Sequence, residues 1–314
     1  MAGSGGLRRL ARGLSEAAFR ERYGTEEPCR AALVQMRWGR GWSCPRCGHG
    51  RRAALERRAL LQCNRCKHQV SLTAGTIFHA TKLPLVTWFQ AIYHLSQSKG
   101  GISSIELGRR LGVRQPTAWL IKHKLMQAMT LREAGKPRLE GRVEIDDAYL
   151  GGERSGGKRG RGAAGKTPFV AAVETTPERR PRRLRLTVVK GFRQGEVEKL
   201  AKAGIAPGTN VVSDGLSCWR AVTKAGCDHW PMITGTGRQA ARWAPFTWVN
   251  TTLGNIKTAL AGTYHHVSAK HAERYLMSFA WRFNRRYQLD SLTERLAFAC
   301  LHATPHPYRT ITAG

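Results

Sequence analysis

The stretch Val143-Glu144-Ile145-Asp146-Asp147-Ala148-Tyr149-Leu150, followed by Gly151-Gly152, places three carboxylates inside a short apolar segment. Its composition and the glycine break predict a β-strand. Successive side chains of a strand point to opposite faces, so we expect Glu144 and Asp146 to share one face and Asp147 to lie on the other. A carboxylate beside a core is costly unless it binds a partner, and a metal ion is the usual partner. The stretch therefore predicts a metal site on a sheet.

A set of further elements follows this strand and predicts what surrounds it. We expect strands at 167–174, 183–189 and 210–215 and a helix at 194–203. A mixed sheet that pairs the first and fourth strands would bring Asp146 next to Asp214. Paired aspartates with a third oxygen donor are what two divalent ions need for chemistry at a phosphoryl oxygen. An ordinary turn is the alternative interpretation of Asp214-Gly215.

A later helix, expected at 249–260, offers the third oxygen donor. Asn250 and Lys257 lie seven residues apart in it, so they share a face within about 20°. An amide oxygen is a neutral metal ligand, and the lysine would point at a phosphate. The alternative role of Asn250 is that of helix N-cap. Asn255 lies two residues from Lys257 and falls on the opposite face, which favours Asn250.

Two CxxC pairs precede this region, separated by fifteen residues. The spacing C-x2-C-x15-C-x2-C predicts one structural zinc ion held by four thiolates, and each pair forms a tight knuckle. A redox-active pair is the alternative, and the duplication argues against it. Eight cysteines in the whole chain are too few for a disulfide scaffold and favour a reducing compartment. The expected zinc ligands are Cys44, Cys47, Cys63 and Cys66.

Between the cysteines and the acidic strand, helical periodicity starts at Pro84, stops at Gly100-Gly101, and resumes at Ser103 and again at Pro116. This rhythm predicts a helix-turn-helix that binds DNA. A three-helix packing unit with solvated charges is the alternative. The side chains expected to meet DNA are Arg114, Gln115, Thr117, Lys122 and Lys124.

The charge balance predicts a polyanionic partner. The chain has 314 residues, with 52 Lys+Arg against 21 Asp+Glu and a formal net charge of +31. No apolar run approaches the roughly 18 residues that span a membrane, so nucleic acid is the expected partner and no membrane is expected. A basic but otherwise ordinary enzyme is the alternative. An apolar fraction of 41% is typical of a globular protein.

Two basic segments are expected to hold a DNA backbone. The first is the glycine-rich loop 151–166, with Lys158, Arg159, Arg161 and Lys166. It satisfies the P-loop pattern, but the residues after it predict a strand and not the helix that a phosphate-binding loop needs. The second is an amphipathic helix at 269–286, with Arg282, Arg285 and Arg286.

Several short motifs of the sequence are more specific to one protein family. They are CPRCG (44–48), CNRCKHQVSLTAGTIF (63–78), VEIDDAYLGG (143–152), GRGAAGKTP (160–168), SDG (213–215), VNTTLGNIK (249–257), GTYHHVS (262–268) and RYLMSFAWRFNRR (274–286). Together they resemble the zinc-ribbon-bearing, ISXO-like transposases of bacterial insertion sequences. The resemblance implies a ribonuclease-H-like catalytic domain with an Asp, Asp, Glu/Asn/His, Lys set.

That set falls on Asp146, Asp214, Asn250 and Lys257, and it implies two Mg²⁺ ions, with Mn²⁺ as a substitute, held by the first three residues. His265, in the stretch after the lysine, is expected to contact DNA. Two departures stand out: Asp147 occupies a position where glutamate is common, and the third ligand is Asn250 and not a glutamate.

The fold class that follows is an α+β multidomain chain. It has an N-terminal zinc ribbon, a helix-turn-helix, and then a ribonuclease-H-like mixed α/β catalytic domain. The expected divisions are a helical lead-in at 1–40, the zinc ribbon at 41–80, the helix-turn-helix at 81–135, the catalytic domain at 140–290 and a C-terminal tail at 291–314.

The function that follows is that of a DNA transposase. It would bind terminal inverted repeats, cleave DNA and join 3′ ends to target DNA, as a homo-oligomer on DNA by analogy with the family. The expected location is the bacterial cytoplasm, at the nucleoid. Two alternatives stay open: a catalytically silent DNA-binding protein derived from such an element, and a ribonuclease-H-like nuclease without strand transfer.

Overall fold

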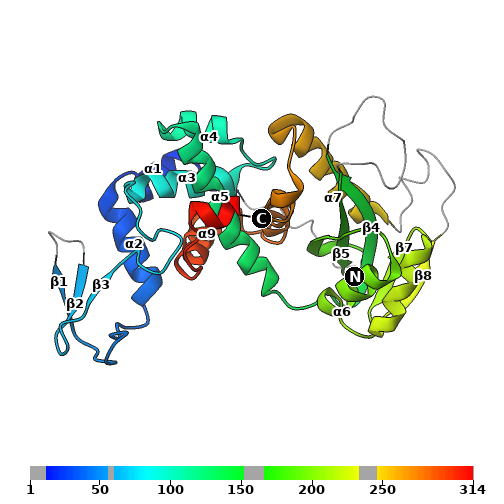
Figure 1. The fold of residues 1–314 in the computed structure, drawn as a ribbon, viewed down its shortest axis with the longest axis horizontal. Coiled ribbons are helices and arrows are strands. Elements are labelled where there is room, and N and C mark those ends of the chain that lie inside the picture. Colours follow the sequence, from blue (N-terminus) through cyan, green and yellow to red (C-terminus); the bar gives the residue numbers. More distant parts are fainter. Residues whose placement is uncertain (1–11, 56–59, 152–165, 233–245, 314) are drawn as a thin grey trace, which may run out of the picture. The chain divides into compact units, whose positions relative to one another are not determined.

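The computed structural model describes residues 12–55, 60–151, 166–232 and 246–313. The chain divides into two compact units (Figure 1). The helical unit comprises residues 1–99, 104–131 and 286–314, and the sheet unit comprises residues 100–103 and 132–285. Within the described ranges, no helix is long and apolar enough to cross a membrane.

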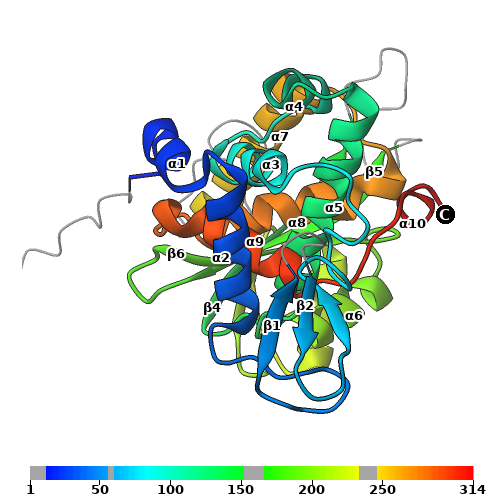
Figure 2. The ribbon, with the colours of Figure 1, turned by 90° about the vertical axis from the view of Figure 1, so that its left-hand side faces the viewer.

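A small antiparallel sheet in the helical unit carries the cysteine knuckles (Figure 2). Its strands, in the order β1-β2-β3, are β1 (Arg52–Leu55), β2 (Leu60–Cys63) and β3 (Gln69–Ser71). The guanidinium of Arg52 lies 5.4 Å from the ring of Trp38 and 5.5 Å from that of Trp42. Because Trp38 ends a helix, these cation–π contacts tie the small sheet to that helix.

The rest of the helical unit is all α. Its elements are α1 (Glu16–Tyr23), α2 (Glu26–Trp38), α3 (Leu85–Gln97), α4 (Ser104–Leu111), α5 (Gln115–Ala134, whose last three residues fall in the sheet unit), α9 (Leu292–Leu301) and α10 (Tyr308–Thr312). The helices α3, α4 and α5 occupy the segment where the periodicity predicts a helix-turn-helix. The apolar face of α3 is buried and packs against α9 and α2.

The C-terminal residues differ from the predicted tail. Residues 292–301 form α9, in which Leu296 and Cys300 are fully buried. The amide of Ile77 donates to the carbonyl of Cys300 at 3.1 Å. The apolar residues of α9 recur at helical spacing, and burying them against α3 supplies a hydrophobic gain that a free tail would forgo.

The sheet unit is built on a five-stranded mixed sheet of order β6-β5-β4-β7-β8 (Figure 1). The strand β5 runs antiparallel to both β4 and β6, whereas β7 is parallel to β4 and β8 is parallel to β7. The first and fourth strands of the unit are therefore neighbours, as predicted. The strands are β4 (Arg142–Leu150), β5 (Thr167–Thr175), β6 (Pro181–Val188), β7 (Asn210–Ser213) and β8 (Asp228–Pro231).

Helices cover both faces of this sheet, so it has two apolar cores. On one face Val143 and Ile145 pack with α6 (Gln194–Gly204) and the 3-10 helix η2 (Ser217–Ala225). On the other face Ala148 and Leu150 pack with α7 (Thr247–Ala259) and α8 (Ala272–Phe283). This mixed α/β unit, together with the cysteine-bearing sheet, confirms the predicted fold class.

Candidate functional site

The acidic cluster lies where β4 and β7 run side by side. Glu144 pairs in register with Val212, so two residues further along the parallel strands Asp146 is level with Asp214. One carboxylate oxygen of each of Asp146, Asp147 and Asp214 lies within 4.8 Å of the others. The sequence-based expectation that Asp147 points away is therefore wrong, because its carboxylate joins the other two.

The electrostatics of the cluster favour a bound cation. The pKa of Asp146 is raised to about 7, chiefly by burial, and the nearby charges of Asp147 and Asp214 contribute to this rise. The amide of Asp147, which donates to Oδ1 of Asp146 at 2.8 Å, and the charge of Lys257 act in the opposite direction. Crowded carboxylates lose their mutual repulsion when a divalent ion binds them. An all-oxygen donor set suits Mg²⁺ or Mn²⁺.

Glu144 has a different role from its neighbours, because it holds α7. Its side chain is 1% exposed, and Oε2 accepts hydrogen bonds from the amides of Trp248 (2.9 Å) and Val249 (3.0 Å) in the first turn of that helix. Oε1 lies 2.9 Å from Nη1 of Arg142. A carboxylate at a helix N-terminus satisfies amides that lack an intrahelical partner and complements the helix dipole.

The helix held in this way carries Asn250 and Lys257. The N-cap position of α7 is Phe246, so the alternative role of Asn250 as N-cap does not hold. Asn250 is partly buried in the first turn after the capped amides, and Lys257 is exposed two turns later. Glu144 and Asp146 lie on the same face of β4. The hydrogen bonds from the Trp248 and Val249 amides to Glu144, called the clamp below, therefore fix α7 relative to the acidic cluster.

We predict that Glu144→Ala lowers the free energy of unfolding by about 2 to 4 kcal/mol, because it removes the acceptor of two helix amides and the ion-pair partner of Arg142. Glu144→Gln keeps an oxygen acceptor and should lose less. The matched control is Glu140→Ala, which removes a glutamate that is 60% exposed and should change stability by about 0 to 1 kcal/mol. Urea unfolding of the three variants measures this, and equal losses for Glu144→Ala and Glu140→Ala would contradict the clamp.

The four predicted zinc ligands converge in the helical unit. The Sγ atoms of Cys44, Cys47, Cys63 and Cys66 all lie within 4.8 Å of one another, and none forms a disulfide. Each knuckle closes with an amide-to-carbonyl bond, from Gly48 to Cys44 at 2.8 Å and from Lys67 to Cys63 at 3.1 Å. Both closing residues have positive φ, as the tight turn requires. Four convergent sulfur atoms suit tetrahedral zinc.

The residues predicted to contact DNA separate into exposed and buried ones. Arg114 and Gln115 are exposed at the start of α5, and Thr117 is partly exposed. Lys122 differs from the prediction, since it is 1% exposed. It lies one turn from Ala118 and from Leu125, which are both fully buried, and so it belongs to the inner side of α5. Lys124 lies 5.9 Å from the ring of Trp88.

Two arginines of the predicted basic helix are also internal. Arg285 pairs with Glu133 at 2.5 Å and donates to the carbonyl of Trp281 at 2.8 Å. Arg282 is 8% exposed and lies 5.1 Å from the ring of Phe279, and burial lowers its pKa. Both arginines are buried, so the prediction that they bind phosphates is wrong. The helix itself ends earlier than predicted, at Phe283.

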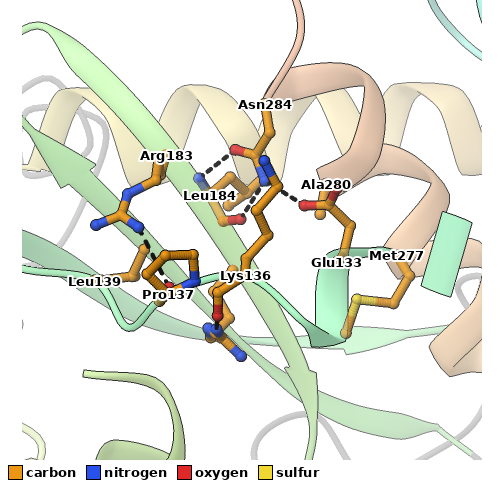
Figure 3. A pocket seen from close by; sticks show the side chains of 10 residues that line it. Glu133, Lys136, Pro137, Leu139, Arg183, Leu184, Met277, Ala280 and Asn284 are labelled. Atoms are coloured by element: carbon orange, nitrogen blue, oxygen red, sulfur yellow. Dashed lines mark hydrogen bonds between the residues drawn. The ribbon is translucent and has the colours of Figure 1, made fainter. Parts of the chain in front are cut away.

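Asn284, just after the end of α8, forms hydrogen bonds that hold this end of the helix (Figure 3). The side-chain amide of Asn284 accepts from the Leu184 amide at 2.7 Å and donates to the Leu184 carbonyl at 2.9 Å, so it pairs with the edge strand β6. It also donates to Glu133 at 2.7 Å. A cavity of about 180 Å³ opens beside these residues, and none of the acidic cluster lines it.

The remaining predicted DNA contacts fall into two groups. His265 is exposed, and Lys166 and Arg286 are partly exposed. The guanidinium of Arg286 lies 4.4 Å from the ring of Tyr287. Lys158, Arg159 and Arg161 lie outside the described residues.

Comparison with known proteins gives matches for both parts of the chain. Residues 138–284 match the family model described as ISXO2-like transposase domain. Residues 24–69 match the model described as transposase zinc-ribbon domain. These two matches confirm the resemblance to zinc-ribbon-bearing, ISXO-like transposases that the sequence motifs indicate.

A curated relative and a solved structure are also similar. An uncharacterized protein in transposable element ISH50 of Halobacterium salinarum is 30% identical over 168 residues, which is 47% of this chain and 54% of that protein. The chain thus matches about half of the relative's length. A chain of a pre-cleavage Mos1 transpososome aligns with a TM-score of 0.25 and 10% identity, over 65% of this chain and 75% of that one. This structural likeness is too low to support an assignment.

Proposed function

We propose that this chain, which carries an ISXO2-like transposase domain and a transposase zinc-ribbon domain, is a DNA transposase. It binds the terminal inverted repeats of its own element, cleaves DNA there and joins the 3′ ends to target DNA. The observation that supports this proposal most is the cluster of Asp146, Asp147 and Asp214 inside the matched domain. A metal-dependent phosphoryl transfer needs such a group of carboxylates.

In this proposal Asp146 and Asp214 hold two Mg²⁺ ions, and Mn²⁺ can replace them. Bound ions supply an activated water or 3′ hydroxyl and stabilise the leaving oxygen. The third oxygen donor is Asn250 from α7 or Asp147 from β4. Lys257, whose charge lowers the pKa of Asp146, offers an ammonium group to a DNA phosphate beside the cluster.

Recognition of the ends falls to the zinc ribbon and to the start of α5, where Arg114, Gln115 and Thr117 are accessible. Backbone phosphates would be held by Lys166, His265 and Arg286 and by the basic residues of the glycine-rich loop. Two element ends have to be brought together, so the proposed active form is a homo-oligomer on DNA. Its place of action is then the nucleoid.

The function is tested with a labelled DNA duplex that carries the ends of the element, incubated with the zinc-loaded chain in Mg²⁺. We expect a cut at the element boundary followed by a joined product that is longer than the substrate. Binding without cleavage would favour a silent DNA-binding protein, and cleavage without a joined product would favour a nuclease. A duplex with scrambled ends is the control, and it should be neither cut nor joined.

A catalytically silent DNA-binding protein is the competing function. Asn250 favours it, because this side chain is neutral and a carboxylate would bind a cation more strongly. The position of Asp147 answers this point. Its carboxylate completes a group of three acids without any contribution from α7. A protein that only binds DNA has no physical reason to keep three repelling carboxylates in a basic chain.

A further inference from the structure

We propose that Trp219 is a positioning residue that fixes the orientation of Asp214 for metal binding. The inference rests on the proposed function, in which Asp214 is a metal ligand. Trp219 belongs to η2, outside the strands and helix that carry the acids and the lysine. Its side chain is fully buried.

The key contact is a hydrogen bond between the indole and the carboxylate. Nε1 of Trp219 donates to Oδ1 of Asp214 at 3.0 Å. The amide of Leu216 donates to the same oxygen at 3.1 Å. Both bonds fall on Oδ1, so a cation that binds at Oδ2 breaks neither of them. Two donors on one oxygen hold the carboxylate plane in one orientation.

The backbone on either side of Asp214 is fixed as well. Ser213 is fully buried, and its Oγ lies 2.8 Å from Nε2 of His229 on β8. The amide of Gly215 donates to the same Oγ at 3.4 Å, and Gly215 has a φ of +84°. With the main chain held, the remaining freedom of Asp214 is rotation of its side chain, and the Trp219 bond restrains that rotation.

The anchor of this bond is the apolar core on the α6 face of the sheet. The ring of Trp219 packs in one cluster with Val211 of β7 and with Ile145 of β4, the residue before Asp146. The same core therefore sets the position of the donor and of both strands that carry the acids. A ligand that is oriented before the ion arrives pays less ordering entropy on binding.

The alternative is that Trp219 only fills the core and that its N–H takes the nearest acceptor. The two interpretations differ in what happens when the N–H is removed and the accompanying loss of ring volume is matched in a control variant. Hydrogen-bond partners of metal ligands contribute about 10- to 100-fold to metal affinity. A purely packing role predicts no specific change in metal affinity for a variant that stays folded.

The experiment compares Trp219→Phe with wild type by titrating the zinc-loaded chain with Mn²⁺ and counting bound ions by electron paramagnetic resonance, without DNA. We expect the Mn²⁺ affinity of Trp219→Phe to fall by about 10- to 100-fold. In a DNA cleavage assay the half-saturating Mg²⁺ concentration should rise similarly, while the rate at saturating Mg²⁺ returns toward wild type.

The matched control is Trp281→Phe in α8. Trp281 is also fully buried in the sheet unit, but its Nε1 has no hydrogen-bond partner within the described part of the chain. Its replacement loses a similar ring volume and no hydrogen bond, so its Mn²⁺ affinity should remain within twofold of wild type. If Trp219→Phe does not fold, benzothienylalanine at position 219 removes only the N–H and preserves the shape of the ring.

The outcomes separate the inference from the function on which it rests. Unchanged Mn²⁺ affinity in a folded Trp219 variant, with affinity lost in Asp214→Asn, would overturn the role of Trp219 and leave the metal site intact. Unchanged affinity in Asp214→Asn would overturn both. Equal losses in the Trp219 and Trp281 variants would show that core packing alone is responsible, which also overturns the inference.

Discussion

Asp146→Asn should lower the rate of DNA cleavage by about a thousandfold or more, while binding to the element ends stays near that of wild type. A metal ion contributes several kcal/mol of transition-state stabilisation, and about 4 kcal/mol corresponds to a thousandfold in rate. Asparagine keeps the shape of the side chain but removes the negative charge that binds the cation. Cleavage of end-labelled DNA and a gel-shift titration measure the two quantities.

The control for this variant is Asp228→Asn, which removes an exposed acid from β8 in the same unit and should leave cleavage unchanged. If Asp146→Asn cleaved DNA at the wild-type rate, the assignment of Asp146 to the metal site would be wrong. Loss of binding together with cleavage would indicate a folding defect, and a thermal unfolding scan of the variant detects that case directly.

The same substitution should stabilise the metal-free chain at neutral and higher pH. Burial raises the pKa of Asp146 from 3.8 to about 7, so between these values the folded state holds a proton that the unfolded state has released. The stability contributed by this group is present below pH 3.8 and is lost as the pH rises toward 7. Asp146→Asn avoids that loss, so in EDTA at pH 8 its Tm should exceed that of wild type, by roughly 2 to 4 °C per kcal/mol recovered. At pH 4 the two should be nearly equal, and a lower Tm for the variant at pH 8 would contradict the electrostatic account.

The sequence predicts the acidic pair correctly because the strands that carry the two acids show as local apolar patterns, and a mixed sheet can pair the first and fourth of these strands. The pattern of short strands places Asp146 and Asp214 on neighbouring strands, and the register confirms it. The role of Glu144 in holding α7 could not be predicted from the sequence. Its partners Trp248 and Val249 lie more than a hundred residues away, and no local periodicity links a strand residue to the first turn of a distant helix.

The buried cations show a related limit. Arg285 and Lys122 look like surface residues in a sequence with so many positive charges. Arg285 is buried because Glu133, 152 residues earlier, supplies the opposite charge inside the fold. One signal was available for Lys122: it lies four residues after Ala118 and three before Leu125, which places it on the apolar side of its helix. Helical spacing should therefore be weighed before charge when DNA contacts are assigned.

Cys63→Ser should eliminate the bound zinc and unfold the ribbon while leaving the five-stranded sheet intact. Zinc binding at a four-thiolate site contributes about 10 to 16 kcal/mol to folding, far more than strands of three or four residues could replace. Elemental analysis should show one zinc per wild-type chain and none in the variant. The ribbon amides of Cys63 and Lys67, which donate to His68 and Cys63, should lose their protection from hydrogen exchange.

Amides of β4 and β5 should stay protected in the same sample, because the sheet has its own two cores. Cys29→Ala is the matched control, since Cys29 is a fully buried thiol of the helical unit that lies outside the cysteine cluster, and this variant should retain its zinc. If Cys63→Ser kept zinc, or if its ribbon stayed protected without metal, the four-thiolate site would not be what holds this domain together. If Cys63→Ser loses its zinc as expected, weakened binding to the element ends with preserved Mn²⁺ binding at the acidic cluster would indicate that the ribbon contributes to DNA binding and not to metal binding by the sheet.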